Sequence, residues 1–350
     1  MQPLMRGTAI MPVARVPLNF FGMPFGLAGL GGCWLTAAEY GLAPPAFGEA
    51  ILVVAALVWL FVVSRYVRDA LFDRAAFARD LLDNVAGPFA SLAVITPMLL
   101  AAEGLYPYAP VAGAIVTDVF IGLTVLLGSW FTGQWIYGPV DIDKFHPGYF
   151  LPTVAGGLVA AAAAAAVGQP RLAEVMFGLG MVCWFVVGSV ILMRMFFRPL
   201  LPGPLLPTVA IEVAPPAVAS LAYFTMTGDR VDTFASMLAG YGLLMVLSQM
   251  RLLPAYLRLP FMPSTWAFTF SWAAVANVAM HWVNGTRPSG YVMYHYVVLA
   301  AITVFIGGIA VRTVIALGRH QLLPRPPRAS PAVYSVTRRG VAWRNRADSR

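Results

Sequence analysis

Apolar runs long enough to cross a lipid bilayer recur along this chain, and short polar segments separate them. A membrane-spanning helix needs about 20 predominantly apolar residues. Ten runs approach or exceed this length, and they cover residues 18–38, 48–67, 85–102, 107–131, 149–167, 172–193, 207–227, 233–250, 263–282 and 292–317. The first run is longer than a typical signal-peptide core, so we interpret it as a membrane helix. The sequence therefore predicts an all-α integral membrane protein with ten transmembrane helices.

The composition agrees with a lipid environment. Hydrophobic residues make up 59% of the 350 residues, and charged residues make up only 11%. A soluble domain carries about 25% charged residues. So many apolar side chains cannot all be buried in one soluble core, and lipid must solvate much of the surface.

Basic residues are distributed unevenly between the two predicted sides of the membrane. If the polar segments alternate between the sides, all but three of the 23 Lys and Arg residues lie on the side that holds both termini. The exceptions are Arg171, Arg230 and Arg287. Because positive charge is retained on the cytoplasmic side, we expect both termini in the cytoplasm and a multi-pass protein of the cytoplasmic (inner) membrane.

This topology predicts three regions. Residues 1–17 form a cytoplasmic N-terminus, residues 18–318 form the ten-helix transmembrane pore domain, and residues 319–350 form a basic cytoplasmic tail. The tail is rich in proline and arginine and poor in large apolar residues, a composition typical of disorder. Its positive charge is suited to contact with anionic lipid head groups, although a tail that only fixes topology has the same composition.

Proline follows the order of the predicted helices. The odd-numbered runs contain proline at Pro24, at Pro88 and Pro97, at Pro152, at Pro207, Pro215 and Pro216, and at Pro263, whereas the even-numbered runs are nearly free of it. Proline removes a backbone donor and kinks a helix, and disturbed backbone at membrane depth is tolerated where it is buried or lines a cavity. We therefore predict five helical hairpins, with kinked odd helices around a central pore and even helices outside. Proline is also common in membrane helices generally and at helix starts, which is the alternative explanation.

One ionisable residue lies deep in a predicted span. Glu212 precedes the Pro215–Pro216 pair in the seventh run. A carboxylate in lipid is costly, so Glu212 should face a cavity or be protonated. A proton-coupling or gating role and a neutral, hydrogen-bonded structural role both fit the sequence at this point.

Enzyme chemistry has no signature in the sequence. The four histidines are not paired at helical spacing, and nucleotide-binding, serine-hydrolase and zinc-protease motifs are absent. Cys33 and Cys183 lie singly in apolar runs and indicate neither a disulfide nor a metal site. We expect no enzymatic activity, no cofactor, no bound metal and no nucleic-acid partner.

Five segments carry motifs in a fixed order: 17–30 (PLNFFGMPFGLAGL), 151–155 (LPTVA), 206–217 (LPTVAIEVAPPA), 232–257 (DTFASMLAGYGLLMVLSQMRLLPAYL) and 266–271 (WAFTFS). Together they resemble the tellurite-resistance/dicarboxylate transporter family, which includes bacterial TehA proteins and plant guard-cell slow-type anion channels. The resemblance covers most of residues 17–285.

The resemblance implies a homotrimer in which every protomer has its own pore. It also implies that a phenylalanine of the ninth helix closes the pore, and the matching residue here is Phe270. Pro24, Pro152 and Pro215 match prolines of the inner helices, and Phe268 is expected to line the pore with them. Pro97 lies slightly later than the family pattern places its proline, and Glu212 stands where related chains often have glutamine.

Three functions follow as hypotheses. The first is a channel for small inorganic or organic anions that Phe270 closes. The second is a proton-coupled transporter of dicarboxylate, sulfite or tellurite-like oxyanions, in which Glu212 carries the proton. The third is a non-transporting membrane sensor or scaffold, which would give no flux even with alanine at position 270.

Overall fold

The computed structural model describes residues 15–138, 140–319 and 321–322. The N-terminal segment before residue 15 and almost all of the predicted tail after residue 318 lie outside the described residues. Every regular element within the described part is helical. The prediction of an all-α membrane protein is confirmed, because nine stretches of the described residues are long and apolar enough to cross a membrane.

Each of the five odd-numbered spans begins with a 3₁₀-helical segment before its α-helix. The third and fifth spans also contain a π-helical turn. Their elements are η1 (Leu18–Phe21) with α1 (Gly22–Glu39); η2 (Gly87–Ser91) with α4 (Leu92–Leu100) and η3 (Ala101–Leu105); η5 (Pro147–Phe150) with η6 (Leu151–Ala155) and α6 (Gly156–Ala166); η7 (Leu206–Val213) with α8 (Ala214–Thr227); and η8 (Pro263–Trp266) with α10 (Ala267–Thr286). Of these, η3 and η6 are π-helical and the other short elements are 3₁₀-helical.

The even-numbered spans are long α-helices without such turns. They are α2 (Pro45–Phe72), α5 (Pro110–Tyr137), α7 (Pro170–Phe197), α9 (Thr233–Tyr256) and α11 (Tyr291–Gly318). Two shorter elements, α3 (Arg74–Leu82) and η4 (Ile142–Lys144), lie in the connections. Three outer helices begin with proline, because proline is well tolerated in the first turn, where its missing N–H has no partner to lose.

Burial separates the two sets of helices. In the four odd-numbered spans that meet the length and hydropathy needed to cross a membrane, 67% to 78% of the apolar window is buried, against 22% to 33% in the five even-numbered spans. The remaining span, η8 with α10, is less apolar because Asn277, His281 and Asn284 lie in its second half. The odd helices are therefore the inner set and the even helices the outer set.

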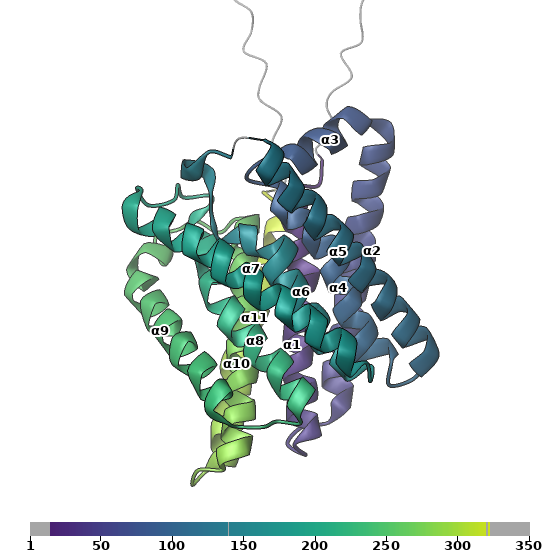
Figure 1. Ribbon diagram of the computed structural model, residues 1–350, viewed down its shortest axis with the longest axis vertical. Coiled ribbons are helices and arrows are strands. Elements are labelled where there is room, and N and C mark those ends of the chain that lie inside the picture. The colour runs from purple at the N-terminus through teal and green to yellow at the C-terminus, as the bar shows by residue number, and fades with distance from the viewer. Residues whose placement is uncertain (1–14, 139, 320, 323–350) are drawn as a thin grey trace, which may run out of the picture. The chain divides into compact units, whose positions relative to one another are not determined.

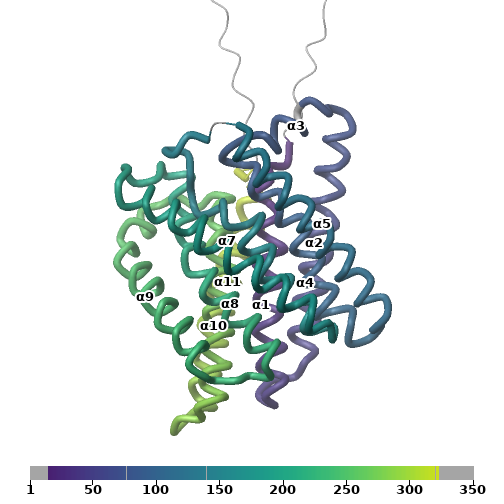
Figure 2. Tube along the Cα trace, in the orientation of Figure 1, coloured from purple at the N-terminus to yellow at the C-terminus, as the bar shows by residue number. Residues whose placement is uncertain are grey.

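The inner helices form a closed ring. In order, α1 packs on α4, α4 on α6, α6 on α8, α8 on α10, and α10 returns to α1. Each inner helix also packs on the outer helix that follows it in the chain, as the predicted hairpins require. Figure 2 shows α1 and α10 side by side although they are far apart in sequence, and Figure 1 shows α2 and α9 at opposite sides of the bundle.

The prolines act differently along the ring. Pro97 lies inside α4 and is followed by the π-helical turn η3, and Pro152 lies in the π-helical turn η6. Pro24 instead falls in the first turn of α1, and Pro215 in the first turn of α8. Proline lacks an N–H and distorts a helix interior but fits a first turn. One outer helix departs from the predicted pattern, since α9 runs past residue 250 and includes Pro254.

His146 fixes the connection into η5. The Nε2 atom of His146 donates to the carbonyl oxygen of Val85 over 3.1 Å, and the N–H of Gly148 donates to Nδ1 over 3.1 Å. Both contacts require the neutral tautomer with its proton on Nε2. Burial lowers the pKa of His146 from 6.5 to about 4.

We expect the protein to lose stability as the pH falls from about 6.5 towards 4. In that window the unfolded chain binds a proton at His146 and the folded chain does not. The contribution of His146 to the free energy of unfolding is therefore complete above the pKa of His146 in the unfolded chain and declines below it. Over the whole window the free energy of unfolding should fall by roughly 3 kcal/mol. Thermal unfolding of the detergent-solubilised protein at several pH values measures it. A His146→Gln variant should show a flatter dependence, and an equally steep one would contradict the assignment.

Candidate functional site

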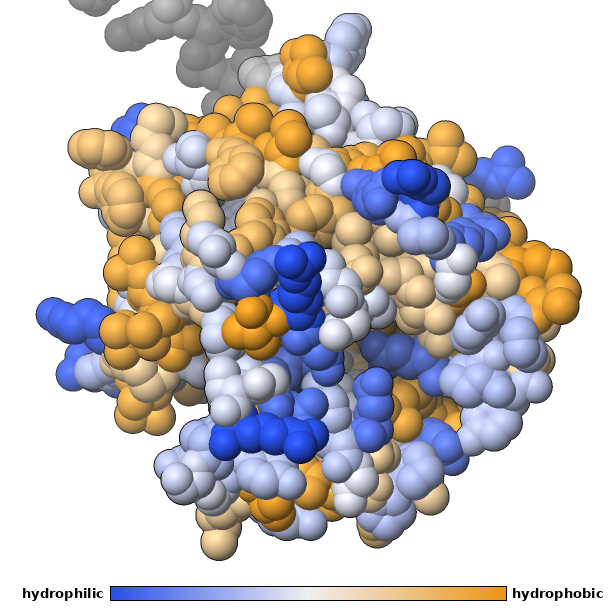
Figure 3. Space-filling model, turned by 60° about the horizontal axis from the view of Figure 1, so that its bottom comes forward, coloured by the Kyte–Doolittle hydropathy of each residue, from blue (hydrophilic) through white to orange (hydrophobic). Residues whose placement is uncertain are grey.

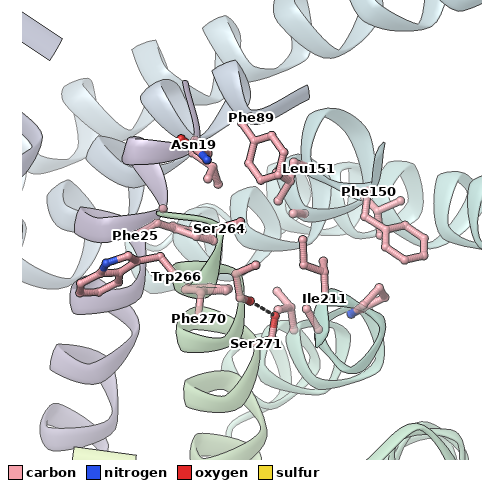
Figure 4. A pocket seen from close by; sticks show the side chains of 18 of the residues that line it. Asn19, Phe25, Phe89, Phe150, Leu151, Ile211, Ser264, Trp266, Phe270 and Ser271 are labelled. Atoms are coloured by element: carbon pink, nitrogen blue, oxygen red, sulfur yellow. Dashed lines mark hydrogen bonds between the residues drawn. The ribbon is translucent and has the colours of Figure 1, made fainter. Parts of the chain in front are cut away.

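A narrow cavity lies among the first halves of the five inner helices. Its volume is about 40 Å³. Every inner helix contributes to its lining, with Phe25, Phe89, Phe150, Ile211 and Ala267 among the residues. Figure 4 shows several of these side chains converging on the same space.

The polar groups of the narrow cavity are uncharged. Asn19 and Ser264 line it, and the Oδ1 atom of Asn19 and the Oγ atom of Ser264 are buried without a hydrogen-bond partner among the described residues. Ser271 donates to the carbonyl oxygen of Ala267 over 3.2 Å (Figure 4). The narrow cavity can therefore offer an ion neutral dipoles and apolar walls but no fixed charge.

A wide cavity lies among the second halves of the same helices. Its volume is about 500 Å³. Its lining includes Thr36, Glu103, Ala163, Thr225 and Asn277, one from each inner span. The connections from inner to outer helices lie at this end, and Figure 3 shows hydrophilic residues gathered over it around a recess.

Phe270 lies between the two cavities. Phe270 and Val218 are the two described residues that line both of them. The Phe270 ring stacks on Phe25 of α1 with ring centroids 3.6 Å apart and an angle of 17° between the ring planes. The aromatic Phe270 and the aliphatic Val218 thus form the boundary between a narrow and a wide space.

The start of α10 holds Phe270 in position. Thr269 is fully buried, and its Oγ1 donates to the carbonyl oxygen of Trp266 over 2.7 Å. Trp266 in turn donates from Nε1 to Oγ1 of Thr313 on α11 over 2.9 Å. Gly26 of α1 faces Thr269, and a Cβ atom there would overlap the threonine side chain. The backbone that carries Phe270 is therefore fixed to α1 and α11, and motion of the ring requires side-chain rotation.

A hydrogen-bonded cluster includes His281, which lines the wide cavity. Nδ1 of His281 lies 2.7 Å from Oδ1 of Asp229 and 2.6 Å from the hydroxyl of Tyr40, which donates to Oδ2 of Asp229 over 2.8 Å. The hydrogen bond from His281 lowers the pKa of Asp229 below its usual value, so Asp229 is ionised near neutral pH. The cluster ties α1 to α10 and to the connection after α8.

The sequence-predicted residues fall into three groups. Phe270 and Pro215 line the narrow cavity, and Phe270 also lines the wide one. Pro24, Pro97 and Pro152 lie in the inner helices without lining either cavity. Phe268 also lines neither, because its ring packs against Tyr256 of α9 with centroids 4.9 Å apart. Successive helix positions point in directions about 100° apart, so Phe268 and Phe270 lie on different faces of α10.

Glu212 is buried in η7 but lines neither cavity. Its Oε1 atom has no hydrogen-bond partner among the described residues. Another carboxylate, Glu103 of η3, does line the wide cavity, and the sequence did not single it out. The predicted third span ended at residue 102, whereas the π-helical turn continues that span to Leu105.

A closed ring of kinked helices around two cavities, with one aromatic side chain between them, is the architecture of a membrane channel or transporter. Residues 15–314 match the family described as SLAC1, voltage-dependent anion channel, and the chain belongs to this family. The family resemblance that the sequence motifs indicated is therefore confirmed.

Two relatives are similar over most of the described chain. The tellurite resistance protein TehA homolog of Haemophilus influenzae is 28% identical over 307 residues, which are 87% of this chain and 92% of that protein. The guard cell S-type anion channel SLAC1 of Arabidopsis thaliana is 25% identical over 280 residues, which are 75% of this chain and 49% of the plant protein. The chain is thus a multi-pass membrane protein of a family of anion channels and transporters.

Proposed function

We propose that this chain conducts small anions across the membrane through the ring of inner helices, and that Phe270 closes the path. The observation that carries the proposal is the position of Phe270 at the boundary of the narrow and wide cavities. An apolar constriction can stop ions by excluding water, so displacement of one ring would open the path. Charged side chains are absent from the described lining of the narrow cavity, so selectivity among small anions should be weak.

The proposal is tested with purified protein in liposomes and planar bilayers. Currents are recorded for the wild type and for Phe270→Ala under a potassium chloride gradient. The reversal potential of the variant should lie near the chloride equilibrium potential, and its current should rise with chloride concentration without strong saturation. A reversal potential near that of potassium, or no current from the variant, would contradict an anion channel.

A proton-coupled transporter of dicarboxylate, sulfite or tellurite-like oxyanions is the second candidate. The observation in its favour is Glu212, a buried carboxylate with an oxygen atom that has no partner among the described residues. A coupled carrier should show saturable uptake that depends on a proton gradient, and Glu212→Gln should abolish that uptake. In a channel the same substitution should change the current little, because Glu212 lines neither cavity.

We also infer that both termini face the cytoplasm of a bacterial inner membrane and that the protein assembles as a homotrimer. The orientation rests on the arginine-poor connections at the wide-cavity end, which hold only Arg171, Arg230 and Arg287 of the chain's Lys and Arg residues. The trimer rests on the family resemblance. Native mass spectrometry of the purified protein should give three times the mass of the chain, and a stable monomer in lipid nanodiscs would contradict it.

A further inference from the structure

The wide cavity is unusual for an anion path because the described lining carries two carboxylates but no Lys or Arg. Among the described residues that line it, the carboxylates are Glu39 and Glu103, and no Lys or Arg is present. His281 also lines the cavity, but it is held by Asp229. An anion that enters this space therefore meets no lysine or arginine side chain among the described lining residues.

Glu103 is the more buried of the two carboxylates that line the wide cavity. It lies in the π-helical turn η3 that follows Pro97, and such turns occur frequently at functional sites. Its Oε2 atom is buried and has no hydrogen-bond partner among the described residues. Gly32 of α1 lies directly opposite, where a Cβ atom would come within 3.2 Å of Oε2. Because Gly32 has no side chain, there is room for the carboxyl group of Glu103 between η3 and α1.

The elements packed against η3 are α4, α5, α6 and α2, and they bring no cation to Glu103 within the described part of the chain. The acidic groups Glu49 of α2 and Asp118 of α5 each accept a hydrogen bond from a neighbouring side chain. Arg65 and Arg68 belong to the last turns of α2, whereas its first turns lie at the wide-cavity end. Neither α4 nor α6 has a titratable side chain.

Across the cavity, α1 and α10 face the same space as Glu103. Glu39 of α1 and His281 of α10 line this space, and Tyr106 follows η3 itself. Cys33 of α1 is buried, and its Sγ donates to the carbonyl oxygen of Ala273 over 3.2 Å. An unpaired carboxylate in such surroundings is costly, whereas a neutral carboxyl group supplies a hydrogen-bond donor.

We propose that Glu103 is a proton-binding site in the wide cavity and that its neutral carboxyl group donates a hydrogen bond to the passing anion. The proton comes from the aqueous solution at the wide-cavity side and returns there when Glu103 ionises. Ionised Glu103 repels the anion, so acidification of that side should increase conduction. This inference rests on the proposed anion path.

The first test uses Phe270→Ala, in which the path is open, with the pH varied only on the wide-cavity side. Its anion current should increase roughly tenfold on acidification, the factor expected when one unit charge is removed at short range in a partly hydrated space. Adding Glu103→Gln should give a high current that no longer depends on pH, because the amide keeps a donor and carries no charge. Adding Glu49→Gln, which alters a carboxylate outside the cavity lining, should leave the pH dependence intact.

The outcomes separate this inference from the proposed function. Persistence of the pH dependence in the Glu103→Gln background, or its loss with Glu39→Gln instead, would overturn the role of Glu103 while leaving the anion path in place. If Phe270→Ala carries no anion current at any pH, the proposed function fails. Glu103 is then tested by difference infrared spectroscopy of the full-length protein at neutral pH. A protonated-carboxyl band that disappears in Glu103→Gln supports the proton site, and the absence of that band overturns it.

Discussion

Replacement of Phe270 by alanine should increase anion conductance at least tenfold over the wild type. Phe270 and Val218 are the two described residues that line both cavities, so this substitution removes the aromatic ring from the boundary between them. A tenfold increase corresponds to a lowering of the barrier by about 1.4 kcal/mol, which is modest for the loss of an aromatic ring from the proposed apolar constriction. Single-channel recording measures the increase directly.

The neighbouring Phe268 provides a matched control for that result. Both residues are phenylalanines in the first turn of α10, yet Phe268 packs on Tyr256 of an outer helix. Phe268→Ala should leave the conductance near the wild-type value, and Phe270→Leu should give an intermediate one. If Phe268→Ala opened the path as widely as Phe270→Ala, the effect would reflect general loosening of α10 rather than removal of a plug.

Gly157→Ala should destabilise the protein strongly, although it adds only one methyl group. Gly157 of α6 meets Gly180 of α7 so closely that a Cβ atom would lie 2.7 Å from the backbone nitrogen and Cα of Gly180. Backbone atoms cannot rotate away as a side chain can, so the two helices must separate. Overpacking of this kind costs about 1–3 kcal/mol, and we expect a clear fall in the thermal unfolding temperature in detergent.

Gly178→Ala is the matched control on the outer helix of the same pair. A Cβ atom at Gly178 would have no heavy atom within 4 Å. Alanine favours a helix over glycine by about 0.8–1 kcal/mol, so this variant should be as stable as the wild type or slightly more stable. Equal unfolding temperatures for the Gly157→Ala and Gly178→Ala variants would contradict a tight contact between α6 and α7.

Much of the fold was predictable because proline and burial follow the same alternation. A proline inside a helix leaves a carbonyl group unpaired, which is tolerated where it is buried in protein, so the proline pattern indicated the inner set. The outer helix α9, which includes Pro254, is the exception. Hairpin order was predictable because short connections force sequential helices to lie side by side. The helix α3 was not anticipated, since its nine residues are too short and too polar to resemble a span.

The candidate site was harder to predict from the sequence than the fold. Phe270 was a candidate because the family resemblance pointed to it, but the different direction of Phe268 depends on where α10 begins after the 3₁₀ turn. Glu103 was missed because the predicted third span ended at residue 102, whereas the π-helical turn carries that span to Leu105. Glu212 was prominent in the sequence, yet only the ring geometry places it outside the cavities.

The hairpin order has an electrical consequence for the ring. Because every inner helix is followed by an antiparallel outer one, all five inner helices run in the same direction, and their first turns meet around the narrow cavity. The N-terminus of a helix carries a partial positive charge of about +0.5. Five such ends create a field that favours anions at the narrow cavity without any basic side chain. The backbone dipoles are aligned along the proposed anion path, so anion currents of equal driving force in the two directions should differ.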